Sequence, residues 1–170
     1  MKAISIVTIL GSGKVSEPEP GYQSAFAVGK ALASAGFAIC NGGYRGIMEA
    51  SAKGAKAAQG KTIGVTARQF PGKVNPWIDE EKVMENWQDR LFGLIHTGDA
   101  YVIFDGATGT LAEFFVIWEM LNKKLIAKPF IIFGSFLHSL VTFLKEQKEM
   151  IFTPHLKLAS TPEQVVEFLA

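Results

Sequence analysis

The chain has a single cysteine, almost no net charge and no unbroken apolar run long enough to cross a membrane. Cys40 is the one cysteine in 170 residues, so an internal disulfide is impossible and a cytoplasmic location is expected. The 17 basic and 16 acidic residues nearly balance, which gives no electrostatic reason to expect a nucleic acid or an anionic membrane as partner. The most apolar stretch, 125–144, is interrupted by Lys128, Pro129 and His138, which argues against a transmembrane helix.

Several catalytic signatures are also missing. No Gly-Lys-Ser/Thr stands at the spacing of a Walker motif, and no Gly-x-Ser-x-Gly elbow is present, which disfavours a P-loop NTPase and a serine hydrolase. His96, His138 and His155 are scattered without metal-ligand spacing, so we expect no metal site. No pyridoxal phosphate motif singles out a lysine, and we expect no organic cofactor.

Short apolar runs alternate with longer stretches of helical period. This alternation is typical of βαβ units, and it predicts one α/β domain over residues 1–170, a doubly wound, Rossmann-like, mainly parallel sheet with helices on both faces. The segment 68–80 holds two prolines and has no period, so we expect a loop bordering a ligand site. The expected strands are 4–10, 37–40, 62–66, 100–104, 130–133 and 156–159, and the expected helices are 22–35, 46–59, 110–121, 135–147 and one beginning at 162.

Glycine-rich turns follow three of these strands. The carboxyl ends of parallel strands share one edge of the sheet, so the three turns are expected to lie together. Glycine allows close backbone approach, and a following helix presents unpaired N–H groups to an anion, so a phosphate is the expected guest. The alternative is that these glycines only make tight turns. The residues expected to hold phosphate are Gly11, Ser12, Gly42, Gly43, Gly106, Ala107, Thr108, Gly109 and Thr110.

Three segments resemble the LOG (Lonely Guy) proteins, long labelled lysine decarboxylase-like. They are the run Gly-Gly-Tyr-Arg-Gly-Ile-Met at 42–48, the stretch 90–99, and the run Gly-Ala-Thr-Gly-Thr-Leu-Ala-Glu at 106–113. The family signature is Pro-Gly-Gly-x-Gly-Thr-x-x-Glu, and its characterised members hydrolyse nucleoside 5′-monophosphates to free base and ribose 5-phosphate, usually as dimers. The resemblance therefore implies an AMP-like nucleotide, N-glycosidic bond hydrolysis rather than lysine decarboxylation, and a homodimer or larger homo-oligomer.

The resemblance also implies two catalytic residues, Glu113 and Arg90. Glu113 would stabilise the positive charge that develops on the ribose ring, and Arg90 would clamp phosphate or ribose oxygens in bidentate fashion. Each residue has a structural alternative. Glu113 could close a capping box with Thr110, and Arg90 could be a solvated helix charge paired with Asp89 or Glu85.

The sequence departs from the family at the turns themselves. Asp105 and Ala107 replace a proline and a glycine of the signature, and Asn41 replaces the first glycine of the earlier turn. An inward-pointing Asp105 would weaken phosphate binding, which favours a second hypothesis, a non-catalytic nucleotide-binding or molybdenum-cofactor carrier protein on the same fold. A third hypothesis is a structural or regulatory dimer without a ligand.

Other residues are open to two interpretations. Tyr44, Trp77 and Trp87 could stack on a base or simply pack, and Asp99 matches a family position but is expected to be a turn residue.

Overall fold

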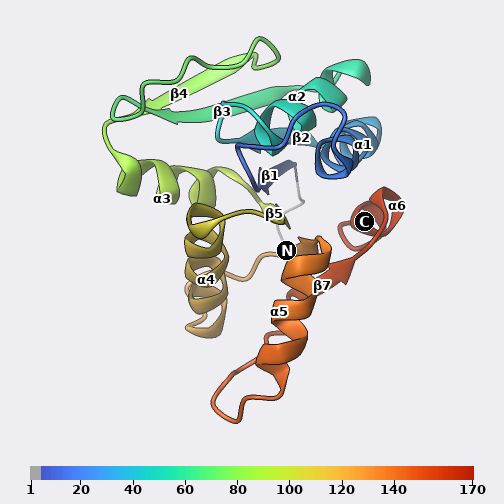
Figure 1. Cartoon of the computed structure of the whole chain (residues 1–170), viewed down its shortest axis with the longest axis vertical. Helices are drawn as coiled ribbons and strands as arrows, with labels where there is room; N and C mark the ends of the chain where they lie inside the picture. Colours follow the sequence, from blue (N-terminus) through green and yellow to red (C-terminus); the bar gives the residue numbers. More distant parts are fainter. Residues whose placement is uncertain (1–4) are drawn as a thin grey trace.

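One parallel sheet organises the computed structural model, which describes residues 5–170 (Figure 1). Its seven strands lie in the order β4-β3-β2-β1-β5-β6-β7, and every neighbouring pair is parallel. The strands are β1 (Ile6–Leu10), β2 (Ala38–Asn41), β3 (Thr62–Ala67), β4 (Glu80–Met84), β5 (Ala100–Phe104), β6 (Phe130–Phe133) and β7 (Leu156–Ala159). The helices are α1 (Pro20–Ser34), α2 (Ile47–Ala57), α3 (Trp87–Thr97), α4 (Thr108–Asn122), α5 (Ser135–Lys145) and α6 (Pro162–Glu167).

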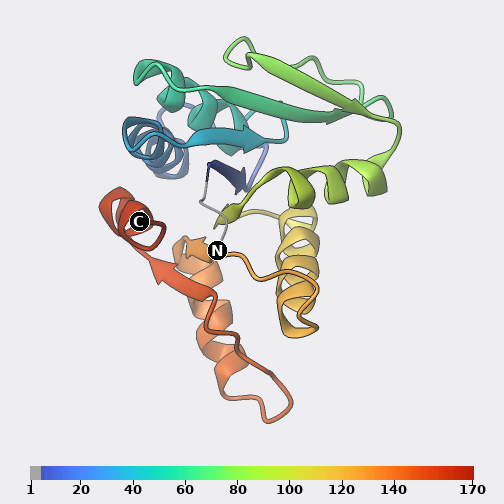
Figure 2. The same ribbon diagram turned by 180° about the vertical axis from the view of Figure 1, so that it is seen from behind.

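Helices cover both faces of the sheet, as Figures 1 and 2 show from opposite sides. The apolar side chains of α1, α2 and α6 pack on one face, and those of α3, α4 and α5 pack on the other. Every residue of β3 and β5 is buried, and β5 accordingly reads as a nearly continuous apolar run in the sequence. The doubly wound fold predicted from the sequence is confirmed.

The strand order reverses at β1, which pairs with β2 on one side and β5 on the other. In doubly wound sheets, the crevice beyond the carboxyl ends of the strands at such a reversal is the usual place for a ligand. The turns after β1, β2 and β5 are therefore brought to one location by topology alone.

Most predicted elements are present, with a few differences. The strand predicted from Ile4 is described from Ile6, and Ile4 itself lies outside the described residues. The expected loop 68–80 runs directly into β4, an edge strand with mostly exposed side chains that the sequence analysis did not predict. Helix α4 begins at Thr108 rather than Thr110. Within residues 5–170, none of the helices has the length and apolar character needed to span a bilayer.

Candidate functional site

A cleft of about 280 Å³ lies where the turns after β1, β2 and β5 meet. Segments from all three glycine-rich turns contribute to its wall, as the topology requires. The lining residues are Ile9, Leu10, Gly11, Ser12, Gly13, Lys14, Gly42, Tyr44, Met48, Phe70, Trp87, Arg90, Leu94, Ala107, Gly109, Thr110 and Glu113. We call this space the cleft.

The first turn of α4 faces the cleft with its backbone donors unused. The N-cap residue Ala107 offers no side-chain cap, and the first bond into the helix runs from the Leu111 N–H to the Ala107 carbonyl, at 3.0 Å. Within residues 5–170, the N–H groups of Thr108, Gly109 and Thr110 have no hydrogen-bond partner. These donors and the positive end of the helix dipole are suited to an anion.

The turn after β1 is tied to the other two turns through the backbone of Ser12. Its N–H donates to the Asp105 carbonyl at 3.1 Å, and its carbonyl accepts from the Ile47 N–H at 2.8 Å. The floor of the cleft is therefore cross-linked by hydrogen bonds from the β5 turn to the start of α2.

The turn after β2 is closed by the buried side chain of Asn41. Its Oδ1 accepts from the Gly43 N–H at 2.8 Å, and its Nδ2 donates to the Met48 carbonyl at 2.8 Å. Gly42 lines the cleft, but Gly43 has a φ of +77° and a β-carbon there would meet Thr66, so Gly43 shapes the turn and does not line the cleft. The asparagine that replaces the family's glycine therefore maintains the turn.

Arg90 projects from α3 and is only 7% exposed. Its Nε donates to the Val65 carbonyl at 2.9 Å, and its Nη2 donates to the Gly42 carbonyl at 3.2 Å. The guanidinium lies 5.4 Å from the centre of the Tyr44 ring and 5.6 Å from that of Phe70. Across the described part of the chain, Nη1 has no hydrogen-bond partner, so it remains available to a ligand.

The interpretation of Arg90 as a solvated helix charge is wrong. Glu85 pairs with Arg68 at 2.9 Å, and the Asp89 side chain accepts from Asn86. Burial lowers the pKa of the Arg90 guanidinium, and the nearby Glu113 carboxylate opposes that effect.

Glu113 lies one turn into α4 and is partly buried in the wall of the cleft. Loss of solvent raises the pKa of its carboxyl group from the usual 4.5 to about 7, and the positive charge of Arg90 counteracts part of this rise. The structural alternative for Glu113, a capping box with Thr110, is wrong, because Ala107 is the N-cap and Thr110 is the third residue of the helix. No hydrogen bond or ion pair to Glu113 is found in residues 5–170. A desolvated carboxyl group beside a buried cation in a cleft is a frequent mark of a functional site.

Asp105 points away from the cleft, contrary to the concern raised by the sequence. Its Oδ1 accepts from the Leu137 N–H at 2.9 Å and its Oδ2 from the Phe136 N–H at 3.1 Å. The carboxylate therefore caps the first turn of α5, whose own N-cap residue Gly134 has no side chain to do so. The charge at position 105 is used for helix capping.

Two further predicted phosphate-binding residues do not line the cleft. Gly106 packs against Thr110, so that a β-carbon at this position would clash with the threonine side chain. Thr108 is exposed at the start of α4, and its side chain does not line the cleft. The predicted residues that do line the cleft are Gly11, Ser12, Gly42, Ala107, Gly109, Thr110, Arg90 and Glu113.

The aromatic candidates separate into two groups. Tyr44 and Trp87 line the cleft, whereas the ring of Trp77 lies under the ammonium group of Lys53 at 5.9 Å. Phe70 was not predicted, because it stands in a loop without a motif. Its neighbour Tyr44 contacts it edge-on, with ring centres 6.1 Å apart.

Asp99 lies at the opposite edge of the sheet, where β5 begins. Its Oδ2 accepts hydrogen bonds from the backbone N–H groups of Ser5 and Ile6 at 3.0 and 3.1 Å. This carboxylate joins the starts of β1 and β5, which agrees with the structural role expected for it.

Comparison with known proteins assigns the family. The sequence model of the SLOG cluster4 family matches residues 4–166. The chain belongs to the SLOG cluster4 family. This Rossmann-like family is related to the LOG proteins, so the resemblance noted in the sequence is confirmed at the level of the family.

The relatives and structural neighbours of this SLOG cluster4 protein include a hydrolase, a cofactor-binding protein and an uncharacterized protein. The chain is 29% identical over 123 residues to an uncharacterized protein of Archaeoglobus fulgidus, covering 72% of this chain and 80% of the relative. It is 29% identical over 111 residues to a cytokinin riboside 5′-monophosphate phosphoribohydrolase of Rhodococcoides fascians, covering 63% of this chain and 56% of that enzyme. Its fold matches that of the molybdenum cofactor binding protein of Rippkaea orientalis with a TM-score of 0.80 and 25% identity, covering 99% of this chain and 96% of the other.

Proposed function

We propose that the cleft binds a nucleoside 5′-monophosphate and that the protein hydrolyses its N-glycosidic bond to free base and ribose 5-phosphate. The observation that carries this proposal is the convergence of three elements in one cleft. These are the unpaired backbone donors of α4, the buried guanidinium of Arg90, and the desolvated carboxyl group of Glu113.

The phosphate is expected at the start of α4. Backbone N–H groups bind a phosphate without an entropic cost for ordering side chains, and the helix dipole adds to the attraction. The Thr110 side chain and the exposed Lys14 also line this part of the cleft and can supply further donors. The Asp105 carboxylate is bound at the start of α5 and does not line the cleft.

The chemistry requires the C1′–N bond to break and a C1′–O bond to form. Positive charge develops on the ribose ring as the base leaves, and a carboxylate at Glu113 stabilises that charge while it orients the attacking water. The proton released by the water is transferred to the departing base. The free Nη1 of Arg90 holds a ribose or phosphate oxygen, while its Nε and Nη2 are kept in place by the Val65 and Gly42 carbonyls.

The test is base release from AMP and related monophosphates, followed by chromatography. We expect wild-type protein to liberate adenine. Glu113→Gln should lower the rate at least about a hundredfold because it removes the negative charge that stabilises the ribose cation. Arg90→Lys should lower the rate by a similar factor because lysine cannot reproduce the hydrogen-bond geometry of the guanidinium group. Glu119→Gln is a matched control on the exposed face of the same helix. If wild-type protein and Glu113→Gln behave identically, the enzymatic proposal is wrong.

A second candidate function is binding or carriage of the molybdenum cofactor without catalysis. It is supported by the nearly complete overlap in fold with a protein that binds this cofactor. Its phosphate would occupy the same backbone donors of α4. Fluorescence of an oxidised pterin released from protein purified from its natural host would favour this candidate, and bound nucleotide identified by mass spectrometry would favour the hydrolase.

We also propose that the protein acts as a homodimer. Several large apolar side chains are exposed on α3 and α4, among them Phe92 at 42% and Phe115 at 43%. Sedimentation equilibrium at micromolar concentration tests this, and a monomer would refute it.

A further inference from the structure

A second hollow of about 530 Å³ adjoins the cleft. Both spaces share four wall residues, Gly13, Tyr44, Met48 and Phe70. The remaining residues of the second hollow are Arg45, Pro71, Gly72 and Lys73. A ligand that fills the cleft therefore has room to continue along the Tyr44 and Phe70 side chains.

The second hollow is positively charged. Arg45 and Lys73 line it, both side chains are exposed, and no acidic residue belongs to its wall. Neither cation has an ion-pair partner within the region 5–170. By contrast, Lys53, Lys56 and Arg68 each pair with a carboxylate at 2.6 to 2.9 Å. Two uncompensated cations in a concave space favour an anionic group there.

The loop that forms this wall is anchored at both ends. At its start, the Ala67 N–H donates to the Tyr44 hydroxyl at 3.1 Å. Toward its end, the Asn75 side chain donates to the carbonyls of Gly43 at 3.0 Å and Tyr44 at 2.8 Å. The second hollow is therefore walled by a fixed loop, which lowers the entropic cost of binding.

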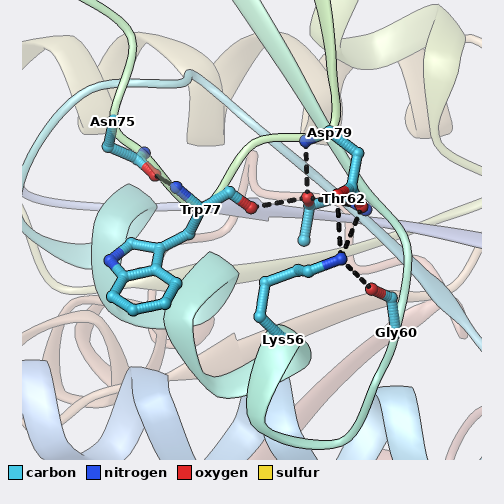
Figure 3. A network of polar contacts seen from close by, with 6 residues as sticks. All are labelled: Lys56, Gly60, Thr62, Asn75, Trp77 and Asp79. Atoms are coloured by element: carbon cyan, nitrogen blue, oxygen red, sulfur yellow. Dashed lines mark hydrogen bonds and ion pairs between the residues drawn. The ribbon is translucent and has the colours of Figure 1, made fainter.

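A polar network fixes the loop further along, as Figure 3 shows. The Thr62 hydroxyl donates to the Trp77 carbonyl at 2.6 Å, and Asp79 accepts from Lys56 at 2.8 Å. These contacts join the end of the loop to β3 and α2. The loop between Ala67 and Asp79 is thus held against the rest of the protein on both sides of Lys73.

From this arrangement we propose that Arg45 and Lys73 form a second anion subsite, and that the preferred ligand is a nucleotide with a second anionic group beyond its first nucleoside. This inference rests on the proposed binding of a nucleotide phosphate at α4. The cleft holds the backbone donors of α4 and Arg90, Tyr44 and Phe70 line both spaces, and the two cations line only the second hollow. In a 5′-phosphorylated dinucleotide, the first nucleoside stands between the 5′-phosphate and the 3′,5′-phosphodiester, so the ligand carries an anion on each side of its first ribose.

The test compares the dinucleotide pApA with AMP by isothermal titration calorimetry. Glu113→Gln is the background, so that neither ligand is consumed. We expect pApA to bind about tenfold more tightly than AMP, because two charge-assisted contacts are added. Arg45→Gln combined with Lys73→Gln is expected to remove this advantage and to change the affinity for AMP by less than about twofold.

A matched control replaces two exposed cations outside both spaces, Lys30→Gln combined with Lys61→Gln. It should leave the preference for pApA unchanged. Equal affinity for the two ligands in the background protein, or equal loss of both in the Arg45 and Lys73 double variant, would overturn the second subsite while leaving monophosphate binding intact. Failure of both ligands to bind the wild-type protein as well would instead refute the proposed function, and the subsite with it.

Discussion

Replacing Glu113 with glutamine is expected to stabilise the folded protein at neutral pH. Burial raises the pKa of the Glu113 carboxyl group from 4.5 to about 7. A difference of this size corresponds to about 3 kcal/mol of destabilisation when the group is ionised. Solvent reaches part of the side chain, so we expect a measured effect of about 1–3 kcal/mol.

The sign of the effect depends on pH. Below pH 4.5, the carboxyl group is protonated in both the folded and the unfolded protein, and glutamine is a close neutral substitute. Between pH 4.5 and 7 the unfolded protein releases this proton before the folded protein does, so the free energy of unfolding of the wild type falls as pH rises. Above pH 7 the full cost is present, and the advantage of Glu113→Gln is greatest.

Urea denaturation at several pH values between 4.5 and 8 measures this difference directly. Glu119→Gln on the same helix is the control, because Glu119 is exposed and only pairs with Lys123 at 3.6 Å. Its effect should stay within about 0.5 kcal/mol at every pH. A difference between wild type and Glu113→Gln that does not change with pH would refute the argument that this carboxylate is desolvated.

Further predictions concern the architecture around the cleft. Base release should increase as pH rises through about 7, because the ionised form of Glu113 is the catalytic one; a rate that falls over this range, measured on AMP, would contradict it. Gly42→Ala should keep the fold, shown by circular dichroism, but lower activity at least about tenfold, since the added β-carbon would displace the Arg90 guanidinium. Asp105→Ala should lower the free energy of unfolding by about 1 kcal/mol through loss of the α5 cap, without weakening AMP binding measured by calorimetry in the Glu113→Gln background. Asn75→Ala should cost about 1–3 kcal/mol in urea denaturation, because the Tyr44 carbonyl loses its side-chain donor and the Trp77 N–H loses its acceptor, while the Gly43 carbonyl keeps only the backbone N–H of residue 75.

The central strands were predictable from the sequence, and the edge of the sheet was not. Strands such as β5 are buried on both faces and therefore appear as continuous apolar runs. Strand β4 pairs only with β3 and carries the sequence Glu-Glu-Lys-Val-Met, most of it exposed. Such an edge strand has neither an apolar run nor a clear alternation, and its hydrogen bonds to β3 determine its conformation.

The location of the cleft could be predicted from the glycine-rich turns, but the directions in which individual side chains point could not be predicted without the tertiary structure. Asp105 was expected near the anion because it adjoins the third turn, yet the N-terminus of α5 binds its carboxylate instead. The local Thr-x-x-Glu pattern at Glu113 suggested a capping box, but the helix begins two residues earlier. The loop 68–80 was expected to border the site and does so through Phe70, but a segment without periodicity does not indicate which of its residues face the cleft.

The central claim is that the unpaired N–H groups at the start of α4 bind the phosphate of a nucleotide. The most direct measurement is a titration of the ¹⁵N-labelled Glu113→Gln variant, which does not consume the ligand, with AMP, followed by two-dimensional NMR of the backbone amides. We predict saturable downfield shifts of the Thr108, Gly109 and Thr110 amide protons, with the same dissociation constant at all three. Saturation of AMP binding without a change in these three signals would contradict the claim.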